Sequence, residues 1–195
     1  MPVLYILAGP NGSGKTTFYD DAVDNGFIDI NLPFLNVDNI TKGLGGYTDE
    51  NYTRAEIIYR QKIKEHISSR VSFMIESNLA RLSDYEWIEN MKKASYETVL
   101  YFVSTESIKE NIARVKRRVS EGGHDIPDHI VTDRYRLGLI YLKSRIQLFR
   151  EVYLLDNSEA TVLLAAHLVN GKIEFEIPHC PEWVNDVLFF VKRVK

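Results

Sequence analysis

Short apolar runs alternate with amphipathic stretches along this chain. The runs are typical of strands buried on both faces, and they lie at Val3–Ala8, Phe34–Val37, Ser72–Ile75, Thr98–Val103 and Val152–Leu155. Elsewhere apolar residues return every three or four positions, which predicts helices that bury one stripe; examples are Ala55, Tyr59, Ile63 and Ile67, then Ile108, Ile112, Val115 and Val119. Strands that alternate with helices predict an α/β fold with a mainly parallel sheet flanked by helices.

Turn and capping residues predict where several elements begin and end. A helix should start near Gly14 and stop before Asn25-Gly26, and Gly122-Gly123 should end a later one. The capping boxes Thr53-x-x-Glu56 and Ser83-x-x-Glu86 predict two further helix starts. Near the C-terminus, Asn170-Gly171 suits a type I′ turn, so Thr161–Ile177 should form a β-hairpin, followed by a closing helix over Pro181–Lys195.

Length and composition fit one globular domain over residues 1–195. Of the 195 residues, 45% are hydrophobic and 26% are charged, which is ordinary for a globular protein with a full core. Cys180 is the single cysteine, so no internal disulfide can form. No apolar run approaches the ~20 residues of a membrane span, and Val3–Ala8 has no basic region before it. We therefore expect a cytoplasmic protein without a signal peptide.

The net charge of −3 conceals a basic segment. From Lys109 to Arg150, ten Lys or Arg residues accompany five Asp or Glu residues. Such a segment in an acidic chain suggests that something anionic binds there, although a solvated helix face would have the same composition.

A phosphate-binding loop is the most specific motif. Gly9–Thr16 matches the pattern G-x-x-x-x-G-K-[ST] and lies between a predicted strand and a predicted helix, as the mechanism requires. Lys15 is expected to reach the β- and γ-phosphates of ATP or GTP, and Thr16 to ligate Mg²⁺. The loop's backbone N–H groups and the helix N-terminus should bind phosphate, which makes the nucleotide-binding residues Gly9, Pro10, Asn11, Gly12, Ser13, Gly14, Lys15, Thr16 and Thr17.

Acidic residues follow three of the predicted strands. Ligands of parallel sheets bind at the carboxyl ends of the strands, where Asp38, Glu76 and Asp156 should lie. Asp38 could take the proton of an acceptor hydroxyl or could be a helix N-cap. Glu76 could hold Mg²⁺ through water, hold a substrate hydroxyl, or pair with a surface base, and nearby Asn78 offers a donor and an acceptor.

Arginines gather in the basic segment. Arg114, Arg117 and Arg118 precede the Gly122-Gly123-His124 loop, and Arg134 and Arg136 follow it. A well-placed arginine stabilises the charge that phosphoryl transfer spreads over oxygen atoms. Two arginine-bearing helices joined by a glycine-containing loop predict a helical lid at about residues 105–150. We interpret His124 as a loop residue, and His124 and His129 lie too far from other soft ligands to indicate a transition-metal site.

Several of these motifs together resemble the zeta-toxin family, in its short, single-domain P-loop kinase-like branch. The resemblance rests on residues 4–17, Asn36-Val-Asp38, Glu76-Ser-Asn78, the segment from Arg118 to Pro127, Asp133-Arg-Tyr-Arg136 and Asp156-Asn-Ser158. It implies a nucleotide-kinase-like fold and phosphorylation of a UDP-N-acetyl amino sugar, with an antitoxin as protein partner. It also implies catalytic roles for Lys15, Asp38, Arg118 and Arg134, and contact of Asp38, Glu76 and Asn78 with the acceptor.

Three hypotheses follow. The chain could be a zeta-type kinase for a UDP-sugar or another small hydroxylated metabolite. It could be a kinase for another acceptor, such as a nucleoside, a sugar acid or an antibiotic. It could also be a nucleotide-binding regulator or ATPase in which the Asp38–Tyr47 loop senses the γ-phosphate. A nucleotide and a small-molecule acceptor are expected partners; no membrane or nucleic acid is expected.

Overall fold

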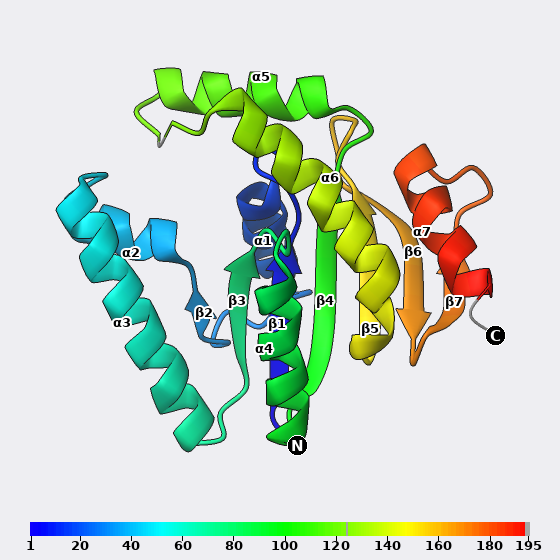
Figure 1. Cartoon of the computed structure of the whole chain (residues 1–195), viewed down its shortest axis with the longest axis horizontal. Helices are drawn as coiled ribbons and strands as arrows, with labels where there is room; N and C mark the ends of the chain where they lie inside the picture. The colour runs from blue at the N-terminus through cyan, green and yellow to red at the C-terminus, as the bar shows by residue number, and fades with distance from the viewer. Residues whose placement is uncertain (124, 194–195) are drawn as a thin grey trace.

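A seven-stranded sheet forms the centre of the molecule (Figure 1). The computed structural model describes residues 1–123 and 125–193, and its strands lie in the order β2-β3-β1-β4-β5-β6-β7. The first five in this order are parallel, and β6 and β7 are antiparallel additions. Their bounds are β1 Val3–Ala8, β2 Phe34–Leu35, β3 Phe73–Ser77, β4 Glu97–Ser104, β5 Glu151–Asp156, β6 Leu163–Val169 and β7 Lys172–Glu176.

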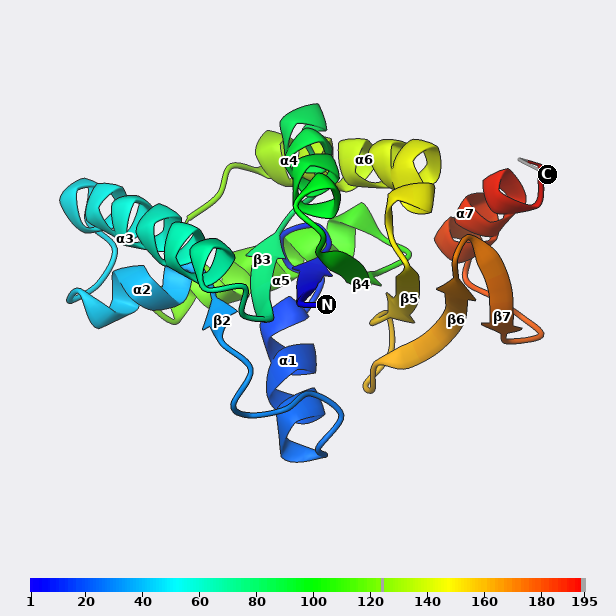
Figure 2. The ribbon, with the colours of Figure 1, turned by 90° about the horizontal axis from the view of Figure 1, so that it is seen from below.

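Helices cover both faces of this sheet. The helices are α1 Lys15–Asp24, α2 Val37–Gly43, α3 Asp49–Ser68, α4 Leu82–Lys93, α5 Ile108–Ser120, α6 Asp128–Arg145 and α7 Glu182–Arg193. Figure 2 shows α1 on one face, and α3, α4, α6 and α7 on the other. Each face buries its own apolar cluster, with Phe18 and Ala22 of α1 in the smaller one. The predicted α/β fold with a P-loop-type parallel sheet is thus confirmed.

A third, small apolar cluster lies between α5 and α6. Val115, Ile126 and Val131 form its buried part. Figure 1 shows α5 lying across the end of the sheet where β3 and β1 end. These two helices are therefore packed on one another above the sheet edge where ligands of such folds bind.

The predicted C-terminal hairpin and closing helix are both present. Asn170 and Gly171 have φ angles of 50° and 73°, which are the left-handed values that a type I′ turn requires. The β6–β7 pair extends the sheet beyond β5, and α7 packs against it.

Both predicted capping boxes are wrong. Helix α3 begins at Asp49, because the Thr48 hydroxyl accepts from the Asn51 N–H at 3.1 Å and caps the helix five residues before Thr53. Thr53 lies inside the helix and donates to the Asp49 carbonyl at 2.9 Å. Helix α4 likewise begins at Leu82, with Arg81 at the N-cap position.

The segment around Asp38 also differs from the prediction. Strand β2 ends at Leu35, and the Asn36 side chain accepts from the Asn39 N–H at 3.1 Å, which starts α2 at Val37. Asp38 is therefore in the first turn of a helix and is not its N-cap. The expected Asp38–Tyr47 loop is helical as far as Gly43.

None of the helices in the described part of the chain combines the length and the apolar character that crossing a bilayer requires.

Candidate active site

The phosphate loop connects β1 to α1 in the conformation that only glycines allow. Gly9, Gly12 and Gly14 have φ angles of 136°, 77° and 90°. A Cβ atom at Gly9 would lie 1.9 Å from the Val103 carbonyl oxygen of β4. The close packing of β1 against β4 thus requires glycine where the loop begins.

Lys15 joins the loop to an acid on the neighbouring strand. Its Nζ donates to the carbonyls of Gly9 at 2.9 Å and Pro10 at 3.2 Å, and it lies 3.5 Å from Oε1 of Glu76. Burial lowers the pKa of the Lys15 ammonium, and the nearby Glu76 carboxylate acts in the opposite direction. The loop therefore holds a desolvated cation beside its phosphate-binding backbone.

The loop also has polar groups that suit phosphate and magnesium. The hydroxyl of Ser13 is fully buried and finds no hydrogen-bond partner among the described residues. Thr16 is exposed in the first turn of α1. Within residues 1–123 and 125–193, no group of three His, Cys, Asp or Glu side chains could hold a metal. Mg²⁺ needs no such cage, because it commonly binds through one or two protein oxygens, phosphates and water, so these residues fit the ion.

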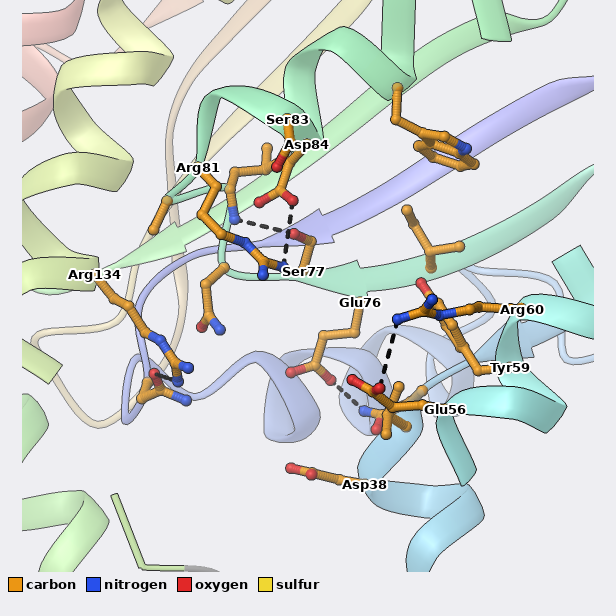
Figure 3. Close-up of a pocket in the computed structure, with 18 of the residues that line it drawn as sticks. Asp38, Glu56, Tyr59, Arg60, Glu76, Ser77, Arg81, Ser83, Asp84 and Arg134 are labelled. Atoms are coloured by element: carbon orange, nitrogen blue, oxygen red, sulfur yellow. Dashed lines mark hydrogen bonds and ion pairs between the residues drawn. The ribbon is translucent and has the colours of Figure 1, made fainter. Parts of the chain in front are cut away.

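Two of the three predicted acids, Asp38 and Glu76, line one pocket beside the loop. Figure 3 shows Asp38, Glu76 and Arg134 projecting into it from α2, β3 and α6. The sequence predicted that Glu76 follows its strand. Strand β3 extends to Ser77, so Glu76 instead lies within the strand. The amide of Asn36 donates to Oε2 of Glu76, which leaves that carboxylate held between Asn36 and Lys15.

The pocket has a volume of about 1120 Å³ and is far larger than the reacting groups need. Its wall includes Asn78, whose Oδ1 is buried without a hydrogen-bond partner in the described structure. The lining also includes the apolar and aromatic side chains of Tyr59, Ile63, Trp87 and Ile88. Ion pairs at 3.5 Å between Arg81 and Asp84, and between Arg60 and Glu56, add charge to the same wall.

Of the predicted arginines, Arg114, Arg118 and Arg134 lie near this site, and Arg114 donates to the carbonyl of Asn157 beside the phosphate loop at 2.9 Å. Nη1 of Arg134 donates to Oδ1 of Asn11 in the phosphate loop at 2.8 Å, and burial lowers its pKa. Arg118 is partly buried and acts electrostatically on Lys15. Arg117 and Arg136 are exposed. His129 is exposed, and His124 lies outside the described residues.

The position of Asp156 at the end of β5 suggested a role in ligand binding, but its hydrogen-bond partners indicate a structural role. Its carboxylate accepts from Trp183 Nε1 at 2.7 Å and from the backbone and hydroxyl of Ser158, each at 3.1 Å. It therefore anchors α7 to the end of β5.

Three asparagines near the loop have roles that were not predicted from the sequence. Asn36 orients Glu76, and Asn111 and Asn157 donate to carbonyls of the phosphate loop. A signal existed for Asn111, which stands on the otherwise apolar stripe of its helix three residues after Ile108 and four before Val115. A polar residue at such a position is buried and needs a partner.

Comparison with known proteins agrees with this geometry. An uncharacterised protein of Haemophilus influenzae is 31% identical over 136 residues, which are 65% of this chain and 88% of the relative. The crystal structure of AvrRxo1-ORF1:AvrRxo1-ORF2 with sulphate ions has a TM-score of 0.70 at 16% identity. The match covers 96% of this chain, but this chain spans only 63% of that one.

A structure from the PezAT chromosomal toxin–antitoxin system of Streptococcus pneumoniae is also similar. Its TM-score is 0.57 at 14% identity, and the match covers 99% of this chain and 85% of that chain. At these identities, both likenesses concern the fold alone.

The sheet order, the phosphate loop and these likenesses define a P-loop kinase-like fold. Residues 1–166 match the family model described as Zeta toxin. The chain therefore belongs to the zeta toxin family.

Proposed function

We propose that this protein transfers the γ-phosphate of ATP or GTP to a hydroxyl group of a metabolite bound in the pocket beside Glu76. The observation that carries the proposal is the contact at 3.5 Å between Lys15 and Glu76. Lys15 belongs to the phosphate loop and Glu76 to the wall of the pocket. A phosphate bound by the loop and a molecule in the pocket would therefore meet at this pair.

In the proposed reaction each side chain has one task. Lys15 and the loop backbone bind the phosphates, and Glu76 and Asn78 orient the acceptor. Asp38 accepts the proton of the acceptor hydroxyl. At the same time the hydroxyl oxygen of the acceptor bonds to the γ-phosphorus, and the bond between that phosphorus and the nucleoside diphosphate breaks. Arg118 and Arg134 offset negative charge on the transferred group. Mg²⁺ held by Thr16 would supply charge neutralisation at the β- and γ-phosphates.

The size of the pocket supports a large acceptor. A volume of about 1120 Å³, with aromatic side chains in the lining, exceeds what a simple sugar would occupy. A UDP-N-acetyl amino sugar has both a sugar hydroxyl and a flat base, and is our first candidate. A nucleoside, a sugar acid or an antibiotic is the alternative.

We further propose that a protein partner regulates this activity. The support is that the similar PezAT structure comes from a toxin–antitoxin system. A kinase that consumes nucleoside triphosphate fits the cytoplasmic location expected from the sequence.

Lys15→Met tests the proposed activity. With radiolabelled γ-phosphate and either a UDP-N-acetyl amino sugar or pooled metabolites, wild-type protein should label an acceptor, and the variant should lose about 10²-fold or more in turnover. Because Lys15 Nζ also donates to the carbonyls of Gly9 and Pro10, the melting temperature of the variant is measured beside its turnover.

The matched control is Lys192→Met, which removes a lysine that pairs with Glu176 at 3.0 Å on the far side of the molecule. This variant should label the acceptor at the wild-type rate. Equal turnover by Lys15→Met and wild type would refute the proposed function.

A further inference from the structure

We propose that Asn111 and Asn157 are positioning residues that fix the phosphate loop in its binding conformation from the outside. This inference rests on the proposed function, because it concerns how the loop binds nucleotide phosphates. The two residues come from different elements, the first turn of α5 and the end of β5, and neither belongs to the loop motif.

Asn111 holds the middle of the loop. Its Nδ2 donates to the backbone carbonyl of Asn11 at 3.0 Å, and its Oδ1 accepts from the hydroxyl of Thr105. The side chain is fully buried. Because both ends of its amide are engaged, the amide has one orientation, in which the donor faces the loop.

Asn157 holds the loop two residues later. Its Nδ2 donates to the carbonyl of Ser13 at 2.8 Å. Its own backbone is fixed at both polar groups, since the N–H donates to Ser104 at 2.8 Å and the carbonyl accepts from Arg114 at 2.9 Å. Strand β4, helix α5 and the loop therefore meet at this one residue.

These two contacts determine where the loop's N–H groups point. In a trans peptide, the carbonyl of one residue and the N–H of the next point in opposite directions, and the described chain has no cis peptide. Drawing the Asn11 and Ser13 carbonyls outward therefore turns the N–H groups of Gly12 and Gly14 the other way. A phosphate oxygen on that side would find donors already oriented, without a cost of reorganisation.

The glycines of the motif make the same contacts possible. A Cβ at Gly12 would lie 2.3 Å from the backbone oxygen of Asn111, and a Cβ at Gly14 would lie 2.0 Å from Nδ2 of Asn157. Two of the loop's glycines thus stand where these asparagines approach. These two positions require glycine because of the clamp that Asn111 and Asn157 form on the loop, and also because of their positive φ angles.

Asn111→Leu and Asn157→Leu test the inference, because leucine is close in shape, uncharged and unable to donate. We expect the KM for ATP–Mg²⁺ to rise about tenfold or more in each variant, while the KM for the acceptor stays near its wild-type value. Asn111→Ser and Asn157→Ser, with side chains too short to reach the loop, should give the same result if a leucine variant does not fold.

Asn185→Leu is the matched control. Asn185 also donates through Nδ2 to a backbone carbonyl, that of Cys180 at 2.8 Å, but it lies on α7 away from the loop. Its KM for ATP should not change. A lowered melting temperature with both Michaelis constants unchanged in the Asn111 and Asn157 variants would reduce these residues to structural ones and refute the clamp. A wild-type protein that binds neither ATP nor GTP would instead refute the proposed function, and the clamp with it.

Discussion

At the scale of residues, Asp38 is the side chain whose role distinguishes the kinase hypothesis from that of a protein that only binds nucleotide. Asp38 lies in the first turn of α2, and Asn36 is the cap of that helix. The Asp38 carboxylate lines the pocket beside the phosphate loop and acts electrostatically on Lys15, Tyr52 and Arg134. Because capping is assigned to Asn36, it no longer competes with a catalytic role for Asp38.

Asp38→Asn should therefore reduce kcat by about 10²-fold or more, because the amide cannot accept the proton of the acceptor hydroxyl. Nucleotide affinity should stay near its wild-type value. The helix loses one favourable charge at its N-terminus, so the free energy of unfolding should fall by only about 0.3–1 kcal/mol. Steady-state kinetics and thermal unfolding of the same preparation measure both effects.

Asp49→Asn is the control for the helix effect. Asp49 is an exposed acid in the first turn of α3 and should lose similar stability without loss of turnover. If Asp38→Asn turned over acceptor at nearly the wild-type rate, Asp38 would not be the base, and the nucleotide-binding regulator or ATPase would become the better hypothesis.

At the scale of elements, α5 and α6 form the proposed lid. Their shared cluster around Val115 and Val131 is separate from the two clusters on the sheet, whereas Leu142 in the second half of α6 is buried in the larger of those two. The beginning of α5 is nevertheless bound to the phosphate loop through Asn111, and α6 is bound to it through Arg134. The lid is therefore attached at its base, and any closing motion should be concentrated at its outer end.

Hydrogen exchange should detect this division. We expect residues 108–115 of α5 to exchange slowly with or without ligand, since that part is packed on the loop. The outer end, from Arg117 to the first turn of α6, should become more protected when a non-hydrolysable ATP analogue and Mg²⁺ are added. Slow exchange over the whole of both helices, unchanged by the analogue, would contradict a mobile lid.

At the scale of the whole molecule, the C-terminal hairpin and helix complete the fold. The family match ends at residue 166, so β7 and α7 lie beyond it. Helix α7 packs Trp183 against Phe102 of β4, with ring centroids 5.9 Å apart, and donates to Asp156. This anchor connects the last helix to the strand that leads to Asn157.

Trp183→Phe should remove the buried donor to Asp156 while keeping an aromatic ring. A buried carboxylate that loses one partner costs about 1–3 kcal/mol, which corresponds to a fall of roughly 2–12 °C in melting temperature for a chain of this size. The affinity for ATP should stay near wild type, because Ser158 still donates to Asp156 at 3.1 Å. A large loss of ATP affinity with unchanged stability would show that the anchor serves the nucleotide site instead.

Local patterns account for much of the fold. The strands and helices were predictable because each has a repeat of apolar positions that spans only a few residues. The β6–β7 turn was predictable because Asn170 and Gly171 accept left-handed backbone angles. Capping patterns were less informative. Thr53 has the residue type of a cap but lies within α3, because Thr48 satisfies the helix end first.

The phosphate loop, the alternation of strands and helices, and the acids near the sheet edge were all predictable from local patterns. The side chains that hold the loop were not, because they come from distant parts of the chain. Asn111 and Asn157 lie 100 and 144 positions from the carbonyls that they bind, and Arg134 lies 123 positions from Asn11. Such contacts exist because β1 pairs with β4, and β4 with β5, which brings the residues after each strand to one edge. Local spacing contains no information about that pairing, so it could not distinguish Asn157, which holds the loop, from its neighbour Asp156, which anchors a helix.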